Sequence, residues 1–365
     1  MLRRRKLAIA LASVALAAGS LAVAGCGDDD DGGSSDGGST LSGSIAGAGA
    51  SSQAAAQEAW IAGFQTANPD TTVSYDPIGS GGGREQFVAG GTAFGGTDAA
   101  LADEELTGAQ DRCGGVDNLI EIPAYVSPIA VVYNLDGVDN LQLKADTLAK
   151  IMNRDITQWN DPAIAAENPD ATLPDQRIVT VARSDESGTT ENFQEYLSAV
   201  AGDVWTYEVD GNWPVKGGET AQGTSGVVAA VRNGSGTIGY ADASQAGDLG
   251  VVAVGVGDEY VLPTPEAAAQ IFSSSERNEG DGQYVFTYDL ARDTTESGTY
   301  PIVLVSYEMA CTSYDDANTA ALVQGYLGYI ISPEGQDAAA AAAGSAPLSD
   351  ETRDLIQPAI EAIGS

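Results

Sequence analysis

Residues Ile178–Thr190, with the sequence IVTVARSDESGTT, decide the fold of this chain and point to its chemistry. The β-branched run Ile178–Val181 predicts a strand, and the pattern that follows predicts an amphipathic helix. Between the two, Arg183 enters a turn of Ser, Asp, Gly and Thr residues. A strand that ends at a helix N-terminus sets free backbone N–H groups beside this guanidinium, which favours a small tetrahedral anion. The same residues also cap ordinary helices, so the stretch alone leaves both interpretations open.

The N-terminus is typical of an export signal. A basic segment, Met1–Lys6, precedes an Ala-, Leu- and Val-rich stretch that ends in Val23-Ala24-Gly25-Cys26. These last residues resemble the processing box of bacterial lipoproteins, in which the cysteine is lipidated. We therefore expect 1–25 to be a lipoprotein signal peptide and Cys26 to carry the lipid, with the body exported and anchored to the outer face of the cell membrane. An uncleaved transmembrane anchor is the alternative, although the apolar stretch is short for a span.

Residues 26–41 are rich in Gly, Ser and Asp and cannot bury an apolar face, so we expect a flexible tether. The whole chain has 52 acidic and 16 basic residues, no histidine, and a formal charge of −36. Cleavage after residue 25 would remove four of the basic residues and no acid, which leaves 52 acidic and 12 basic residues and a balance of −40. Nucleic acid is thereby excluded as a partner. An anionic ligand would need short-range hydrogen bonds in a shielded cleft, because charges more than about 8 Å apart are screened.

The body is predicted to form two α/β lobes. About 325 residues follow the tether, which is more than one core usually supports, and short β-rich runs alternate with helical stretches. The apolar runs Ile129–Tyr133 and Ile302–Ser306 are predicted to be the strands that cross between the lobes. Lobe I would then comprise 42–127 and 305–365, and lobe II 128–304. This division puts Cys113 and Cys311 in one lobe, where either a disulfide or two free buried thiols would be possible.

Four polar turns follow predicted strands. They are Gly49–Ser52, Gly79–Gly82, Thr97–Asp98 and Arg183–Thr189, and the second of them precedes a predicted helix Glu85–Ala89. In open α/β sheets, ligands bind beyond the carboxyl ends of the strands, where helix N-termini converge. Four such turns around one arginine therefore favour a shared anion site over four unrelated helix caps.

Five segments resemble the signatures of the phosphate-binding proteins of phosphate-specific ABC transporters, and the likeness extends from about Ser42 to Gly344. They are GAGASS (Gly47–Ser52), IGSGGGREQF (Ile78–Phe87), FGGTDAAL (Phe94–Leu101), ARSDESGTT (Ala182–Thr190) and AAVRNGSGTIGYAD (Ala229–Asp242). The resemblance implies a two-lobed periplasmic-binding-protein fold, with two mixed sheets flanked by helices and joined by two crossing strands. It also implies a monomer without cofactor or enzymatic activity, which captures inorganic phosphate and delivers it to the permease subunits of an ABC transporter.

The resemblance assigns the phosphate contacts to Ser51, Ser52, Ser80, Asp98, Arg183, Ser187, Gly188 and Thr189. From its residue type and position, we expect Asp185 to orient Arg183 from behind without direct contact with the phosphate. Asp98 would accept a hydrogen bond from the P–O–H group that phosphate keeps at neutral pH and that sulfate lacks. The chain departs from the family pattern at Ser52, where the family has phenylalanine, and at Glu186, where it has glycine. The side chain of Glu186 is therefore expected to point away from the site.

The sequence also leaves room for functions other than phosphate delivery. The same fold could bind another oxyanion such as sulfate or molybdate, or act as a phosphate sensor. A phosphoesterase would need Ser80 or Ser187 as a nucleophile, but without histidine there is no Ser-His-Asp triad, and no compact metal-ligand motif is present. We interpret Thr224 as a helix cap, 234–237 as a hairpin-like turn, and Trp159, Trp205 and Trp213 as packing residues.

Overall fold

The computed structural model describes residues 41–364. The predicted signal peptide, Cys26 and the tether up to residue 40 lie outside the described residues, so export and lipidation stay predictions. Within residues 41–364, no helix is both long and apolar enough to cross a membrane.

Strands and helices alternate over much of the described range, and three helices, α9, α10 and α11, follow the last strand. The helices are α1 (Ala54–Ala67), α2 (Ser80–Val88), α3 (Asp103–Cys113), α4 (Ala145–Met152), α5 (Pro162–Glu167), α6 (Gly188–Ala201), α7 (Gly223–Asn233), α8 (Pro265–Ser274), α9 (Ala317–Ile331), α10 (Pro333–Ala343) and α11 (Asp350–Glu361). The longer strands are β1 (Gly43–Gly49), β2 (Thr71–Asp76), β3 (Phe94–Thr97), β4 (Leu119–Asn134), β6 (Val179–Arg183), β8 (Thr237–Asp242), β10 (Ala253–Val256) and β15 (Val303–Cys311). The shorter ones are β5 (Gln142–Leu143), β7 (Glu219–Ala221), β9 (Gly250–Val251), β11 (Glu259–Val261), β12 (Glu276–Arg277), β13 (Tyr284–Val285) and β14 (Tyr288–Asp289).

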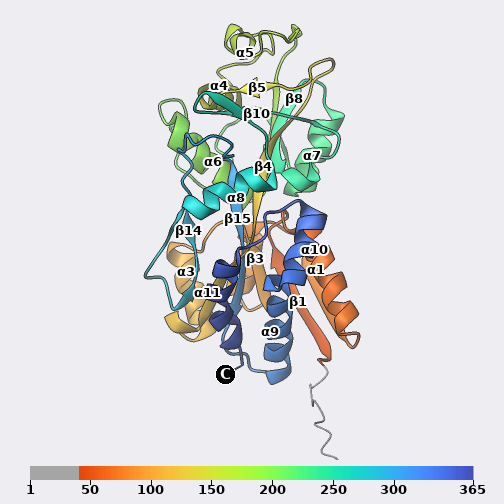
Figure 1. The fold of residues 1–365 in the computed structure, drawn as a ribbon, viewed down its shortest axis with the longest axis vertical. Helices are drawn as coiled ribbons and strands as arrows, with labels where there is room; N and C mark the ends of the chain where they lie inside the picture. The colour runs from red at the N-terminus through yellow and green to blue at the C-terminus, as the bar shows by residue number, and fades with distance from the viewer. Residues whose placement is uncertain (1–40, 365) are drawn as a thin grey trace, which may run out of the picture. The chain divides into compact units, whose positions relative to one another are not determined.

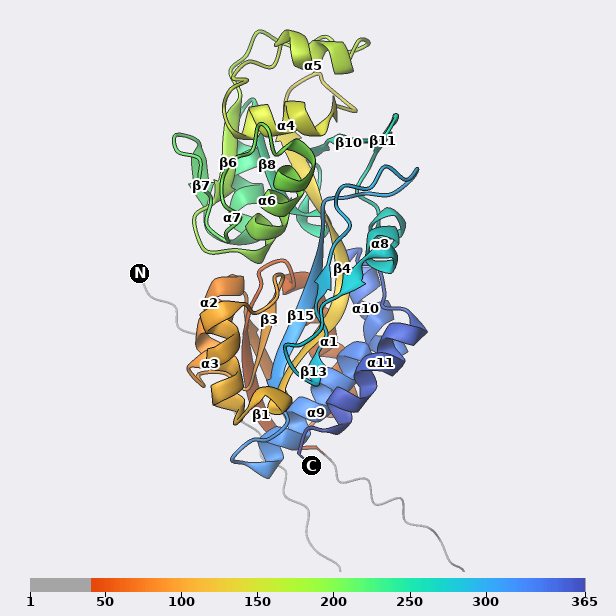
Figure 2. The same ribbon diagram turned by 90° about the vertical axis from the view of Figure 1, so that its left-hand side faces the viewer.

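The main sheet has the strand order β2-β1-β3-β15-β4-β8-β6-β7. The groups β2-β1-β3 and β8-β6-β7 are each parallel, whereas β15 pairs antiparallel with β3 and β4, and β4 pairs antiparallel with β8. Figures 1 and 2 show β4 and β15 running side by side between a lobe that carries α1–α3 and α9–α11 and a lobe that carries α4–α7. The predicted fold class, a two-lobed α/β fold with two crossing strands, is therefore confirmed.

The long strand β4 belongs to both lobes. Its first part pairs with β15 as far as Pro128, and from Ile129 it pairs with β8. This change of partner lies beside the predicted lobe boundary at 127/128, although the exact lobe limits stay a prediction. We call the β1–β3 side lobe I and the β6–β8 side lobe II.

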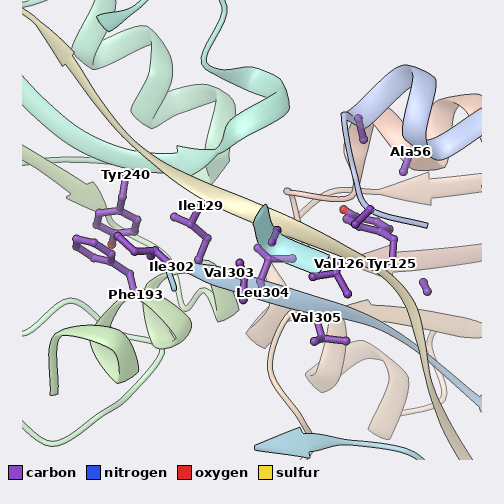
Figure 3. Packing of buried hydrophobic residues seen from close by; sticks show 14 of the residues in the cluster. Ala56, Tyr125, Val126, Ile129, Phe193, Tyr240, Ile302, Val303, Leu304 and Val305 are labelled. Carbon is purple, nitrogen blue, oxygen red and sulfur yellow. The ribbon is translucent and has the colours of Figure 1, made fainter. Parts of the chain in front are cut away.

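The crossing strands also carry the core from one lobe into the other. Every residue from Leu119 to Tyr133 is buried, as is all of β15, which explains why both read as nearly continuous apolar runs. Figure 3 shows this core extending from Phe193 and Tyr240 in lobe II, past Ile129, to Tyr125 on the lobe I side. The rings of Phe193 and Tyr240 stack with their centroids 4.6 Å apart. The tryptophans Trp159, Trp205 and Trp213 pack in or against the same core, as predicted.

Helix α2 begins at Ser80, so the predicted start at Glu85 was wrong. Gly79 has a φ of 103° and turns the chain, but the glycines after it are helical. A Cβ on Gly83 would lie 2.3 Å from the Cα of Gly49. Glycine is thus needed there because α2 packs directly on β1, and not because the segment is a flexible turn.

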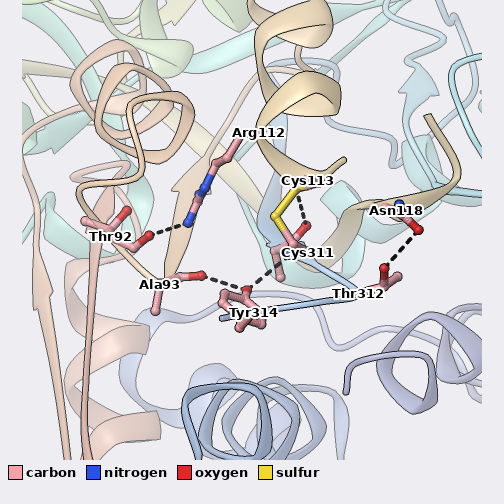
Figure 4. The surroundings of a disulfide bond; sticks show 9 residues. Thr92, Ala93, Arg112, Cys113, Asn118, Cys311, Thr312 and Tyr314 are labelled. Carbon is pink, nitrogen blue, oxygen red and sulfur yellow. Dashed lines mark hydrogen bonds between the residues drawn. A yellow bond between two sulfur atoms is a disulfide. The ribbon is translucent and has the colours of Figure 1, made fainter. Parts of the chain in front are cut away.

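A disulfide joins Cys113, at the end of α3, to Cys311, at the end of β15, with their Cα atoms 5.2 Å apart. Figure 4 shows its surroundings, where Tyr314 accepts a hydrogen bond from the backbone N–H of Cys311 (3.1 Å) and donates one to the carbonyl of Ala93 (2.8 Å). The bond closes a loop with a sequence separation of 198, which contains the whole of lobe II. It therefore ties together the two chain segments that build lobe I.

Replacing both Cys113 and Cys311 by serine should lower the free energy of unfolding by about 2–5 kcal/mol, because a loop of this length loses much conformational entropy in the unfolded chain when it is closed. Urea unfolding of the exported body measures this. The chemically reduced wild type serves as the control and should match the double variant. An unchanged midpoint at an unchanged slope would contradict the prediction.

Candidate anion-binding site

Asp98 lies at the centre of the candidate site, directly after β3, and only 2% of its surface is exposed. Its carboxylate accepts hydrogen bonds from the hydroxyls of Ser52 (2.7 Å), Ser306 (2.8 Å) and Thr189 (3.0 Å). Its backbone N–H donates to the hydroxyl of Ser80 at 3.2 Å. Hydroxyl groups of both lobes therefore converge on one buried carboxylate.

Burial raises the pKa of Asp98 above its ordinary value. The hydrogen bonds from Ser52, Ser306 and Thr189 and the positive charge of Arg183 act in the opposite direction, because they favour the ionised form. Hydroxyl groups can donate as well as accept, so they match a carboxylate that is itself only an acceptor.

Arg183 ends β6 and is 3% exposed. Its guanidinium makes a two-pronged contact with Asp185, with Nε 2.8 Å from Oδ1 and one terminal nitrogen 2.5 Å from Oδ2. Burial acts to raise the pKa of Asp185, but its hydrogen bonds and the charge of Arg183 outweigh this and the pKa is lowered. Asp185 therefore contacts Arg183, and its role in orienting this guanidinium toward a ligand stays a prediction.

The same pair of side chains packs against lobe I. A Cβ on Gly79 would lie 2.7 Å from Oδ2 of Asp185 and 3.4 Å from a terminal nitrogen of Arg183. Since Gly79 immediately precedes Ser80, the arginine of lobe II meets the lobe I turn that was predicted to share its ligand.

Helix α6 directs its N-terminus at Asp98. Ser187 is the N-cap and accepts a hydrogen bond from the backbone N–H of Thr190 at 3.2 Å. A Cβ on Gly188 would lie 2.8 Å from both the Cβ of Asp98 and the hydroxyl of Ser80, so no side chain fits there. The free N–H groups and the dipole of this helix end favour negative charge at the same point.

Ser51 contacts the other lobe at a second place. Its hydroxyl lies 3.1 Å from that of Thr224 and accepts from the backbone N–H of Thr224 at the same distance. Thr224 belongs to the first turn of α7, whose N-cap is Gln222, so the interpretation of Thr224 as a helix cap was wrong. Its hydroxyl instead holds Ser51.

Glu186 points to Arg84 of lobe I, with its Oε1 2.7 Å from a guanidinium nitrogen. Arg84 is 3% exposed and also donates to the hydroxyl of Thr97 at 3.1 Å. The acid that departs from the family pattern is therefore paired with the cation Arg84.

The structure thus gathers Ser52, Ser80, Gly188 and Thr189 around Asp98, places Arg183 with Asp185 against Gly79, and joins Ser51 to Thr224. Sequence reasoning missed Ser306, Thr224, Asn192, whose side chain donates to the carbonyl of Asp98, and Arg84. Ser306 had a usable signal, since it is a polar residue inside an apolar strand. Among residues 41–364, no cluster of His, Cys, Asp or Glu side chains could hold a metal ion.

Comparison with known proteins finds relatives over most of the chain. A family model described as the PBP superfamily domain matches residues 34–334. The phosphate-binding protein PstS 3 of Mycobacterium tuberculosis is 37% identical over 319 residues, which cover 86% of this chain and 85% of that protein. A solved high-affinity periplasmic phosphate-binding protein (PfluDING), bound with phosphate, is similar with a TM-score of 0.70 at 22% identity, covering 86% of this chain and 93% of its own. A phosphate-binding protein from Stenotrophomonas maltophilia has a TM-score of 0.66 at 17% identity and covers 87% and 93%.

Proposed function

Because the chain belongs to the phosphate-binding-protein family of the PBP superfamily, we propose that it captures inorganic phosphate between its two lobes and delivers it to the permease of an ABC transporter. The observation that carries this proposal is the buried carboxylate of Asp98, which is surrounded by hydroxyl donors of both lobes beside the N-terminus of α6.

The donor set suits a small tetrahedral oxyanion. Arg183 offers a planar guanidinium that Asp185 already orients, and such a group contacts phosphate oxygens well. The backbone N–H groups at Gly188 and Thr189 come from a helix N-terminus. The remaining contacts proposed for phosphate are the hydroxyls of Ser51, Ser52, Ser80, Ser187 and Thr189.

The hydroxyl groups can exchange partners at little cost. Ser51 and Thr224 bond each other, and Ser52 and Thr189 bond Asp98. A hydroxyl turns about one bond, so each of these groups can present its hydrogen to a phosphate oxygen without a backbone movement. The carboxylate of Asp98 would then accept from the P–O–H group of the ligand.

Asp98 is proposed to provide selectivity. Phosphate at neutral pH carries at least one proton, whereas sulfate carries none. The oxygens of sulfate and the buried carboxylate of Asp98 are all hydrogen-bond acceptors, so they would repel each other. Discrimination by an unpaired buried polar group is far stronger than discrimination by size.

Membrane attachment belongs to the proposal as well. An exported monomer, anchored through a lipid on Cys26 and the tether 26–41, would hold its lobes near the permease. The acidic charge of the chain does not favour contact with anionic lipid, so the lipid would provide the membrane link.

Calorimetric titration of the soluble body with phosphate, sulfate and molybdate, beside a phosphatase assay, tests the function. Phosphate binding with exclusion of sulfate and without turnover is expected. Tighter binding of sulfate or molybdate than of phosphate would indicate that the protein transports that other oxyanion. Hydrolysis of a phosphate ester would support the phosphoesterase alternative. The relatives are binding proteins and not enzymes, so turnover is not expected.

Replacing Arg183 by alanine should weaken phosphate binding by about 1–3 kcal/mol or more, the scale of a hydrogen bond to a buried charged group. Arg232→Ala removes an arginine whose side chain is 46% exposed and pairs with Asp248, so it controls for loss of positive charge. Calorimetry on both variants measures the difference. Wild-type affinity in Arg183→Ala would remove this residue from the site.

Replacing Asp98 by asparagine should lower the preference for phosphate over sulfate about tenfold or more, because an amide can donate where the carboxylate can only accept. Competition titrations with the two anions measure this ratio. Asp242→Asn is the matched control, since Asp242 is also buried and accepts from Ser127 and Ser244. Equal effects of the two variants would argue against a selective role for Asp98.

A further inference from the structure

We propose that Arg84 and Glu186 form an ion pair between the lobes that sets how slowly bound phosphate is released. This inference rests on the proposed function, because it concerns the closing of the same two lobes. Arg84 and Glu186 act here as positioning residues, since neither is proposed to touch the ligand.

Arg84 is fixed to lobe I by contacts within that lobe. Its Nε lies 2.8 Å from Glu105 of α3, and it donates to the hydroxyl of Thr97, the residue before Asp98. Its side chain is 4% exposed. A buried guanidinium that is held in this way needs little rearrangement to receive a further carboxylate.

The further carboxylate comes from lobe II. Glu186 lies in the turn between β6 and α6, and its Oε1 is 2.7 Å from Arg84. Gly81 makes room for it, because a Cβ on Gly81 would lie 2.4 Å from the Cδ of Glu186. A glycine inside a helix such as α2 is less favourable than alanine, and the packing of Glu186 explains why glycine is there.

The pair lies directly beside the proposed ligand contacts. Arg84 is one helical turn after Ser80 on α2, so both side chains share one face of the helix. Glu186 directly precedes the N-cap Ser187 of α6. Fixing Glu186 to Arg84 therefore fixes the N-terminus of α6 against the start of α2.

Arg84 also lies among carboxylates of both lobes. The closed arrangement brings Glu186 and Glu191 of lobe II near Glu105 of lobe I, and all three carboxylates interact with Arg84. Burial, together with Glu195, Glu105 and Glu186, raises the pKa of Glu191 to about 7, whereas the charge of Arg84 lowers it. Arg84 thus offsets part of the repulsion between acidic side chains of the two lobes.

Arg84 keeps Glu105 whether the lobes are open or closed, because both residues belong to lobe I. It gains Glu186 only on closure. Loss of Glu186 should therefore speed release, whereas loss of Glu105 should not. The two carboxylates make a matched pair, with contact distances of 2.7 and 2.8 Å and side-chain exposures of 43% and 40%.

The test compares phosphate kinetics of the wild type, Glu186→Gln and Glu105→Gln by stopped-flow. Trp213 lines a cavity of about 340 Å³ together with Arg183, so its fluorescence can report binding. Glu186→Gln should release phosphate about threefold to tenfold faster than the wild type. This factor lies between the effect of losing an exposed ion pair and the effect of losing a hydrogen bond to a charged group. Its association rate should stay within about twofold of the wild type, because affinity changes within one interface arise mostly in dissociation. Both variants change the net charge equally.

Release from Glu186→Gln at the wild-type rate, or equal acceleration in both variants, would overturn the ion-pair proposal while phosphate binding stands. If the wild type does not bind phosphate, the proposed function fails, and small-angle scattering without ligand then decides on the ion pair. A larger radius of gyration in Glu186→Gln than in both wild type and Glu105→Gln supports it, and identical radii overturn it.

Discussion

The buried carboxylate of Asp98 is the constraint on which the site depends. A carboxylate with 2% exposure is costly unless donors surround it, and here they come from Ser52, Ser306 and Thr189. Each donor arrives on a different element, so the segment before α1, strand β15 and helix α6 must all be placed correctly before the charge is satisfied. The site therefore depends on the packing of the two lobes, since Thr189 of lobe II can donate to Asp98 of lobe I only when the lobes are in contact.

Within lobe I, the crossing strand β15 places one of these donors, Ser306, beside Asp98. Strand β15 lies between β3 and β4, and its register sets Tyr307 beside Thr97, next to Ser306 and Asp98. Gln53 donates to the hydroxyl of Ser306 from the other side at 2.9 Å, which leaves that hydroxyl free to donate to Asp98. The disulfide holds the far end of β15 to α3. Strand β15, which is central to the core, thus also contributes a side chain, Ser306, to the candidate site.

The sequence predicted the features that depend on local chemistry. Residues Ile178–Thr190 form the expected strand, turn and helix, because β-branched residues, an N-cap serine and an amphipathic pattern all act over a few residues. The crossing strands were found only in part, since the predicted runs Ile129–Tyr133 and Ile302–Ser306 cover the most apolar portions of β4 and β15, which extend over Leu119–Asn134 and Val303–Cys311. The contact of Thr224 with Ser51 was missed because it joins residues 173 positions apart, and no local pattern encodes it. The start of α2 was missed because a run of glycines in a sequence usually indicates a turn. Here Gly81 and Gly83 lie within the helix, and glycine is needed because Glu186 and Gly49 pack closely against them.

An anion site must also be reconciled with a formal charge of −36. The two arginines at the lobe interface are each 3% exposed and each bound to carboxylates, Arg183 to Asp185 and Arg84 to Glu105 and Glu186. Neither cluster therefore carries a large positive field that could draw an anion from a distance. Binding has to come from directed donors at short range, and these are strong only where water is excluded. Exclusion of water would require the two lobes to close over the ligand, and the proposed pair of Arg84 with Glu186 would support that closure from outside the ligand contacts.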